Sequence, residues 1–448
     1  MVEHMFGRLK GKTEVYSVDQ IPENRRTAKP SSVFFIWFAS NLTVGDFAIG
    51  FIPVSLGLSL EYSIIAILGG TILGGILLSM MSILGPKTGL PQMAIGKQSF
   101  GIRGGSFLSA LQWGNTAGWL TVNVILASFA LFLAVNIPYY FVILLIVAIV
   151  AFTSLIGYRA IRIFEKAMSF VIGVMFVALL FFLPIQKIGS VYHAVPVMPV
   201  MAIFGITFAS SFSYIMSWGP YASDYSRYIG REYRQISTFS YTLIGSSAAT
   251  ILAEITGMIV AILSKNPSGN PASDLFSVMG PYAIVGMLSL FLGGISANAI
   301  NLYSNSLSFI SIGIRVKRYV PIIIASVFSL ILGIIGFRIF YQFYETFLFM
   351  LDYWITPWIA ILVADFFIVN RKRPFNIRNV PVINARGILS YSAALLISIP
   401  FMAPSGIYEG PIAKLIGGFD ISYFVSFFLA IVFYVCMSKF TDRHQSMK

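Results

Sequence analysis

The sequence predicts an all-α integral membrane protein with about twelve transmembrane helices. Of its 448 residues, 57% are hydrophobic and only 10% are charged, whereas a soluble protein carries about 25% charged residues. Apolar stretches of roughly 20 residues recur from end to end, and each is long enough to cross about 30 Å of hydrocarbon. Because these stretches do not alternate polar with apolar residues, they predict helices and exclude the strands of a membrane barrel.

The distribution of basic residues predicts the topology of these helices. We expect spans at residues 33–57, 62–84, 105–131, 136–157, 163–184, 198–221, 237–263, 281–312, 319–337, 342–368, 387–403 and 421–438. Of the 30 Lys and Arg residues, all but four lie in the two tails and alternate loops; the exceptions are Lys187, Lys265, Arg338 and Lys414. Because positive residues are retained in the cytoplasm during insertion, we expect a multi-pass protein of the cell membrane with both termini cytoplasmic. Residues 1–32 lack the apolar core of a signal peptide and are expected to form a cytoplasmic tail.

Several classes of function find no support in the sequence. The net charge of +13 follows from the topology and does not indicate a nucleic-acid partner. A single cysteine, Cys436, rules out a disulfide framework and a cysteine-rich metal site. The loops are too short for a catalytic domain, and GxSxG, HExxH and P-loop patterns are missing. We therefore expect a protein surrounded by membrane lipid that is not an enzyme and carries no cofactor.

The first expected span contains polar residues where hydrocarbon should surround it. Asn41, Thr43, Gly45, Asp46 and Pro53 fall near its middle. Glycine and proline weaken a helix and free carbonyl groups that can bind a cation, and a carboxylate at a helix centre costs ~2.5–3.5 kcal/mol. Two interpretations remain open: a kinked helix in which Asp46 bonds a neighbouring helix, or a site for a cation or a proton.

The sixth expected span carries a second interruption at Ser217–Pro220. Proline after Gly219 removes a backbone donor and restrains the preceding residue, although a plain helix end would look the same. The two interruptions are five spans apart, which is typical of an inverted-repeat transporter with its site at the broken helices. This predicts a 5+5 inverted-repeat core with broken helices 1 and 6, plus two C-terminal helices. The expected units are residues 33–190, 191–373 and 374–448.

Polar patches on the third and eighth spans can face that site. Asn115, Thr116 and Trp119 lie within about one turn, and an indole beside glycine suits stacking on a flat ring, with core packing as the alternative. On the eighth span, Asn298 and Asn301 share one face with Asn305. That stripe can join helices or bind the amides of a ligand.

Two further acids, Glu254 and Asp352, are candidate proton carriers or partners of polar neighbours. Both fall inside expected spans, where an ionisable side chain is rare and usually functional. The sequence does not separate these two interpretations.

Several motifs resemble those of the nucleobase:cation symporters, the purine, cytosine, allantoin and hydantoin permeases. The resemblance runs from about residue 34 to 373 and is most specific in the sixth span. The motifs are Pro86-Lys-Thr-Gly-Leu-Pro91 followed by Ser99-Phe-Gly101, Gly114-Asn-Thr-Ala-Gly-Trp119, Trp218-Gly-Pro-Tyr-Ala-Ser-Asp-Tyr-Ser-Arg-Tyr228, and Tyr353-Trp-Ile-Thr-Pro357 through Asp365.

The resemblance implies secondary active transport by alternating access and a set of site residues. An aromatic residue that stacks on the base falls on Trp119, and a polar residue that contacts its edge falls on Thr116. The asparagine that reads the amide groups falls on Asn298. The sixth-helix contacts fall on Ser217, Trp218 and Gly219.

For the coupling ion, the resemblance implies a sodium site between helix 1, near Ser40 and Thr43, and helix 8, where Gly293 and Ser296 fall. The chain departs from the sodium-coupled members at Ala297, where they tend to have a second hydroxyl. Asp46 could bind a proton instead, or restore a ligand for sodium. The coupling ion, H⁺ or Na⁺, is therefore left open.

The predicted function is symport of a flat, amide-bearing heterocycle, such as a purine or pyrimidine base, into the cytoplasm. The nearest alternative is an amino-acid transporter of the same broken-helix architecture, which would offer a helix N-terminus to the substrate carboxylate. A channel would show no saturation or ion coupling, and an intramembrane enzyme would alter its substrate chemically.

Overall fold

The computed structural model describes residues 16–264, 270–336, 353–371, 380–404 and 407–446. Within these residues, nine helices are long and apolar enough to cross a membrane, and the bent pair Ser31–Ser40 and Val44–Ser55 supplies a tenth span. Two shorter apolar helices, Tyr353–Val369 and Ala385–Phe401, stand where the tenth and eleventh spans were expected. The predicted fold class, an all-helical membrane protein with a broken first helix, is confirmed.

The helices follow the expected spans closely. Those that build the bundle are α2 (Ser31–Ser40), α3 (Val44–Ile49), α4 (Phe51–Ser55), α5 (Leu60–Thr88), α6 (Gln92–Val135), α7 (Tyr139–Ile156), α8 (Tyr158–Phe182), α9 (Ile188–Val191), α10 (Val200–Met216), η3 (Gly219–Tyr221), α11 (Ala222–Ser226), α12 (Gln235–Leu263), α13 (Pro271–Met279), α14 (Ala283–Ser311), α15 (Tyr319–Gly336), η5 (Ala364–Val369), α17 (Ala385–Ser398), α18 (Pro411–Leu415) and α19 (Ser422–Ser446).

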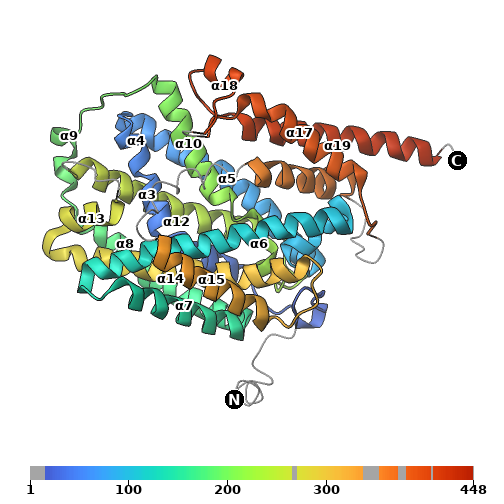
Figure 1. Cartoon of the computed structure of the whole chain (residues 1–448), viewed down its shortest axis with the longest axis horizontal. Helices are drawn as coiled ribbons and strands as arrows, with labels where there is room; N and C mark the ends of the chain where they lie inside the picture. The colour runs from blue at the N-terminus through green and yellow to red at the C-terminus, as the bar shows by residue number, and fades with distance from the viewer. Residues whose placement is uncertain (1–15, 265–269, 337–352, 372–379, 405–406, 447–448) are drawn as a thin grey trace, which may run out of the picture.

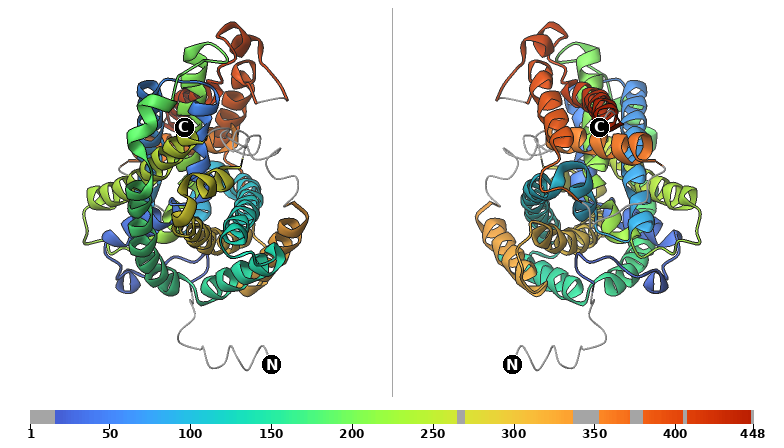
Figure 2. Two further views of the ribbon diagram at one scale, coloured as in Figure 1. Left: turned by 90° about the vertical axis from the view of Figure 1, so that its left-hand side faces the viewer. Right: turned by 90° about the vertical axis from the view of Figure 1, so that its right-hand side faces the viewer.

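Two groups of helices pack around the broken first span. One group joins α2 to α4 with α5, α10 and α12, and the other joins α6 and α7 with α14 and α15. The short helix α3 touches α12 on one side and α6 and α14 on the other, so the break lies between the two groups. The long helix α6 runs along the bundle (Figure 1). The C-terminal pair, α17 and α19, pack on each other on the side opposite α7 and α15 (Figure 2).

Glycines allow the broken span to approach its neighbours closely. A Cβ on Gly257 of α12 would lie 1.9 Å from the carbonyl oxygen of Phe47. A Cβ on Gly293 of α14 would lie 1.9 Å from the carbonyl oxygen of Leu42. Small residues let membrane helices pack backbone to backbone, and here they press α12 and α14 against opposite sides of the break.

One expected loop is helical instead. The stretch 84–104 was expected as a long loop, but α5 continues to Thr88 and α6 begins at Gln92. Gly101 adopts a φ of 77° inside α6, which glycine tolerates. The helix is therefore kinked there, and residues 92–100 form a short arm ahead of the spanning part.

Residues 16–30 of the expected tail pack against the bundle. Ile21 donates its backbone N–H to Gly89, and Ala28 donates to Tyr228. The buried guanidinium of Arg227 donates to the carbonyl oxygens of Tyr16 and Ser17 at 3.1 and 2.7 Å. This segment covers the end of the bundle where α5 and α11 finish.

Candidate substrate and ion site

The first helix stops at Ser40 because side chains compete for its last carbonyl groups. The Ser40 hydroxyl donates to the carbonyl oxygen of Ile36 at 2.8 Å, and the Asn41 amide donates to that of Trp37 at 2.7 Å. The chain then turns extended at Thr43, whose hydroxyl accepts the Asp46 N–H and caps α3. The two halves meet at 59°, so the interruption predicted at Asn41–Asp46 is confirmed.

The sixth span is interrupted as well, though it bends less than the first. Helix α10 ends at Met216, a 3₁₀ turn covers Gly219–Tyr221, and α11 follows. The whole stretch Val200–Ser226 still counts as one span, while the first span alone, among the described residues, bends by more than 40°. The Gly-Pro pair therefore breaks the hydrogen-bond ladder without a sharp change of direction.

The two interruptions contact each other directly. The Trp218 indole N–H donates to the Asn41 side-chain oxygen at 2.9 Å, and the hydroxyls of Thr43 and Tyr214 lie 2.8 Å apart. The Ser217 hydroxyl, in contrast, bonds the carbonyl of Tyr214 on its own helix. Of the predicted site residues, Trp218 and Thr43 thus join the two interrupted spans.

Trp119 lies beside these contacts. Its ring packs edge-on against Tyr214, with the centroids 5.7 Å apart at 89°, and it is only 4% exposed. Since Tyr214 bonds Thr43, the indole lies one side chain away from both helix interruptions. The predicted stacking residue is therefore adjacent to the broken helices.

The predicted polar patches of α6 and α14 face each other along a shared seam. Asn305 donates to the Thr116 hydroxyl at 2.8 Å, and Asn298 donates to the carbonyl of Leu120 at 3.0 Å. Asn301 donates to the side-chain oxygen of Asn298 at 3.2 Å. Both ends of the Asn298 amide are thus used within the protein, which makes Asn298 a residue that orients its neighbours.

Several amide groups in this seam are buried without a hydrogen-bond partner among the described residues. They are the side-chain oxygens of Asn115, Asn301 and Asn305. Gln112 Nε2 and the Tyr221 hydroxyl are buried as well and interact with each other. A buried polar group left unsatisfied costs about 1–3 kcal/mol, and these three oxygens can accept hydrogen bonds from a ligand. Gln112, Asn305 and Tyr221 were not among the predicted site residues.

A buried acid that the sequence analysis missed stands at the predicted sodium position. The Ser296 hydroxyl of α14 donates to the carboxylate of Glu165 on α8, and neither side chain is exposed. Ser296 follows Gly293 by one turn, and Gly293 touches the Leu42 carbonyl at the break. Glu165 was not singled out in the sequence, although it falls inside the span expected at residues 163–184.

Asp46 points elsewhere. Its carboxyl group is fully buried and faces the carboxyl group of Glu254 on α12. One oxygen of Glu254 accepts a hydrogen bond from the Ser211 hydroxyl at 2.7 Å. The ion-coupling residues predicted together therefore fall into two environments, one around Ser296 and one around Asp46. The other acid singled out in the sequence, Asp352, lies outside the described residues.

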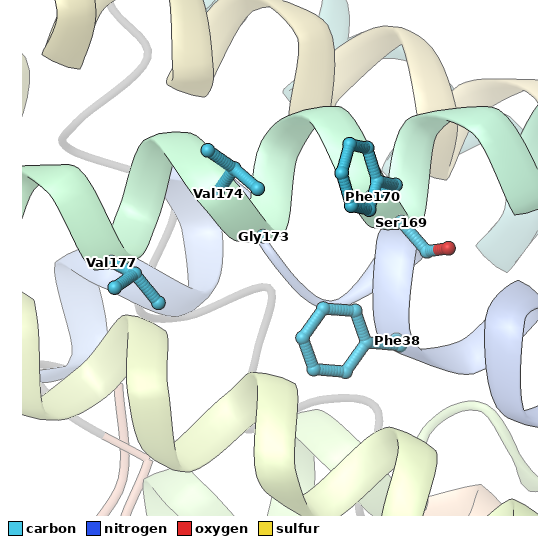
Figure 3. A pocket seen from close by; sticks show the side chains of 6 residues that line it. All are labelled: Phe38, Ser169, Phe170, Gly173, Val174 and Val177. Carbon is cyan, nitrogen blue, oxygen red and sulfur yellow. The ribbon is translucent and has the colours of Figure 1, made fainter.

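A groove of about 330 Å³ between α2 and α8 does not belong to this site (Figure 3). It is lined by Phe38, Ser169, Phe170, Gly173, Val174 and Val177. Phe170 is 74% exposed, and the Ser169 hydroxyl bonds the carbonyl of Lys166 on its own helix. The groove offers apolar surface to the outside of the bundle, where lipid tails fit.

Comparisons with known proteins agree with this geometry. A family model described as a permease for cytosine/purines, uracil, thiamine and allantoin matches residues 20–426. The chain is 27% identical to the putative purine-cytosine permease YxlA of Bacillus subtilis, over 96% of each protein.

Two solved structures have a similar fold. One is Mhp1, a nucleobase-cation-symport-1 family transporter, closed with bromovinylhydantoin bound, with a TM-score of 0.79 at 20% identity over 96% of each chain. The other is the inward-facing conformation of Mhp1, with a TM-score of 0.72 at 18% identity over 96% of each chain. The bundle described above is therefore a known transporter fold, and it is more similar to the closed conformation.

Proposed function

Because the chain belongs to the family of permeases for cytosine, purines, uracil, thiamine and allantoin, we propose that it is a cation symporter that imports a nucleobase or a related flat heterocycle. Transport proceeds by alternating access, with both termini in the cytoplasm as the basic residues indicate. Mhp1, which has this fold, has been captured in closed and inward-facing conformations.

The observation that carries the proposal is the seam of unsatisfied amides beside an indole. Base edges present donors and acceptors side by side, and Asn and Gln amides match them. The oxygens of Asn115 and Asn301 accept from the substrate, the Gln112 amide donates to it, and Trp119 stacks on its ring.

The remaining predicted substrate residues support these contacts. Thr116 is bonded to Asn305, and Asn298 is bonded to Asn301, so each holds a contact residue in place. Trp218 joins the two interruptions through Asn41, while Ser217 and Gly219 shape the turn beneath the substrate. A site built around such bonds rejects analogues that lack the matching groups.

The coupling cation belongs at the first-span interruption. Glu165 and Ser296 supply a carboxylate and a hydroxyl beside the freed carbonyl of Leu42, which suits a monovalent cation. Ser40 and Thr43 already bond protein groups in this conformation. A sodium ion and a proton on Glu165 share this chemistry, and the experiment below separates them.

The amino-acid alternative fits less well. In that case the N-terminus of α3 would receive the substrate carboxylate. The first turn of α3 carries Asp46, a buried acid, and two carboxyl groups there would repel.

Uptake into proteoliposomes tests the function. We expect saturable uptake of at least one labelled compound from a panel of cytosine, uracil, adenine, hypoxanthine, allantoin and hydantoin, with sodium and pH gradients imposed separately. Asn301→Ala should abolish it, while Ser277→Ala, on the exposed face of α13, should not. Uptake of leucine or alanine without any of the heterocycles would refute the proposal.

A further inference from the structure

Asp46 and Glu254 form a pair of carboxyl groups in the membrane interior, away from Glu165 and Ser296. Asp46 lies in the first turn of α3 and Glu254 midway along α12, and both are 0% exposed. A Cβ on Gly50 would lie 2.0 Å from the carbonyl oxygen of Glu254 itself. With Gly257 against Phe47 on the next turn, the two backbones are in contact on either side of the pair, and the carboxyl groups come within reach of each other.

Hydroxyl groups lie beside both carboxyl groups of the pair. Ser211 donates to one oxygen of Glu254 at 2.7 Å. The other oxygen of Glu254 and both oxygens of Asp46 are buried, and they face each other and the Thr250 hydroxyl. The Thr250 hydroxyl, one turn before Glu254, is equally buried and faces Asp46 without a hydrogen bond of ordinary geometry. Both carboxyl groups and the Thr250 hydroxyl therefore lie together in the interior of the bundle.

Two ionised carboxylates repel each other strongly when they lie this close together in the membrane interior. Neighbouring acids in a low-dielectric environment ionise one at a time, and the pair retains a proton. A basic side chain beside the pair would balance the negative charge of two carboxylates. The side chains that interact with Asp46 and Glu254 are instead those of Thr250, Ser211 and the two acids themselves.

The other titratable groups of the neighbouring helices lie elsewhere. On the elements packed against α3 and α12 they include Glu61 and Lys87 of α5, Lys97 and Arg103 of α6, Arg159, Arg162, Glu165 and Lys166 of α8, Tyr214 of α10 and Asp274 of α13. Tyr214 bonds Thr43, and Glu165 bonds Ser296. Among the described residues, no group of three His, Cys, Asp or Glu could hold a metal ion.

We propose that Asp46 and Glu254 hold one exchangeable proton between them and form a second ion-binding centre, separate from Glu165 and Ser296. Its link to the transport cycle, which rests on the proposed function, is mechanical. Thr43 caps α3 by accepting the backbone N–H of Asp46, and the Thr43 hydroxyl also bonds Tyr214 beside Trp119. Loss of the proton leaves two negative charges facing each other, which pushes α3 away from α12 and disturbs the substrate site.

Infrared difference spectroscopy on the purified full-length protein tests the proton directly. At neutral pH, the C=O band of a protonated carboxyl group should shift or disappear in both Asp46→Asn and Glu254→Gln, because either substitution changes the pair that holds the proton. The double variant should lack this one band and no other, because one proton is shared. Asp420→Asn serves as the matched control: this buried acid accepts four hydrogen bonds, from Tyr353, Ala403 and twice from Ser422, and its replacement should leave the band unchanged.

Three outcomes would overturn the proposal. One is an unchanged band in both single variants, and another is the loss of two separate bands that add in the double variant. The third is loss of the wild-type band on adding sodium at constant pH, which would assign the pair to sodium. Thr250→Val keeps both acids and should shift the band without removing it. This variant still tests the pair if the substitutions of the acids prevent folding.

Transport provides the second readout. In proteoliposomes, Asp46→Asn and Glu254→Gln should lose the stimulation of uptake by an inward pH gradient while still binding substrate. If no heterocycle is transported at all, the proposed function fails, yet the infrared result still decides whether the pair holds a proton. If uptake is intact and equally stimulated by the pH gradient in both variants, the second centre fails and the proposed function stands.

Discussion

The indole of Trp218 donates a hydrogen bond to the side chain of Asn41 over 2.9 Å, across 177 positions of sequence. Asn41 at the same time donates to the carbonyl of Trp37, so one amide both ends the first helix and binds the second interruption. The two breaks therefore act as one structural unit, and a change in one is transmitted to the other.

Replacing Asn41 tests this unit. Asn41→Leu removes the acceptor and leaves the Trp218 N–H buried without a partner, which should lower the free energy of unfolding by about 1–3 kcal/mol. Adding Trp218→Phe should recover part of that loss, because both polar groups are then gone. Thermal unfolding in detergent measures the effect, and strictly additive losses in the double variant would contradict a direct bond.

Trp119→Ala should weaken substrate binding. A stacked base contributes about 1–3 kcal/mol, which corresponds to about a 5- to 150-fold rise in Kd, and Trp119→Phe should keep much of the affinity. Equilibrium binding of the transported compound measures this. Trp354→Ala, which removes an equal ring near Trp358, is the control, and an equal loss in both would show that Trp119 acts through stability alone.

The sequence predicted the elements that depend on local chemistry. Continuous apolar runs located the spans, and Gly219-Pro220 together with the polar run at Asn41–Asp46 located the interruptions, because a membrane helix with such residues cannot remain regular. The contact between the interruptions was not predictable, since it depends on packing across 177 positions.

Glu165 shows why part of the site was missed. Nothing in the local pattern shows that its side chain turns inward to Ser296. The same holds for Asn298, whose position on the seam was predicted but whose amide is engaged at both ends by Leu120 and Asn301. These contacts depend on tertiary packing and cannot be predicted from the spacing of residues in the sequence.

Gly293→Ala should block transport. The added Cβ would lie 1.9 Å from the Leu42 carbonyl oxygen, so α14 must move away from the first-span interruption, and both ion affinity and uptake should fall. Gly114→Ala is the matched control, because a Cβ there meets nothing within 4 Å and should stabilise the helix by about 1 kcal/mol. Uptake and the unfolding temperature are measured for both variants. Normal uptake by Gly293→Ala would show that transport does not require close contact between α14 and the first-span interruption.

Glu165 and Ser296 should control the response to the coupling ion. Glu165→Gln keeps the size of the side chain and a partner for Ser296 but removes the charge, so the ion gradient should no longer drive accumulation. Exchange of substrate across the membrane without a gradient should continue, because the amide seam is untouched. Ser296→Ala removes a hydrogen bond to a charged group, worth about 1.5–3 kcal/mol, and should raise the ion concentration needed for half-maximal uptake by about 10- to 150-fold.

Ala297→Ser identifies the ion at that position. The new hydroxyl adds an oxygen ligand next to Ser296, and both positions are buried on α14. If sodium occupies the site, this variant should respond to lower sodium concentrations than the wild type, because one more oxygen coordinates the ion. If a proton on Glu165 is the coupled species, the sodium response should not change while Glu165→Gln still abolishes accumulation. Uptake measured against sodium at fixed pH, and against pH without sodium, separates the two, and full ion-driven accumulation by Glu165→Gln would remove this acid from the coupling mechanism.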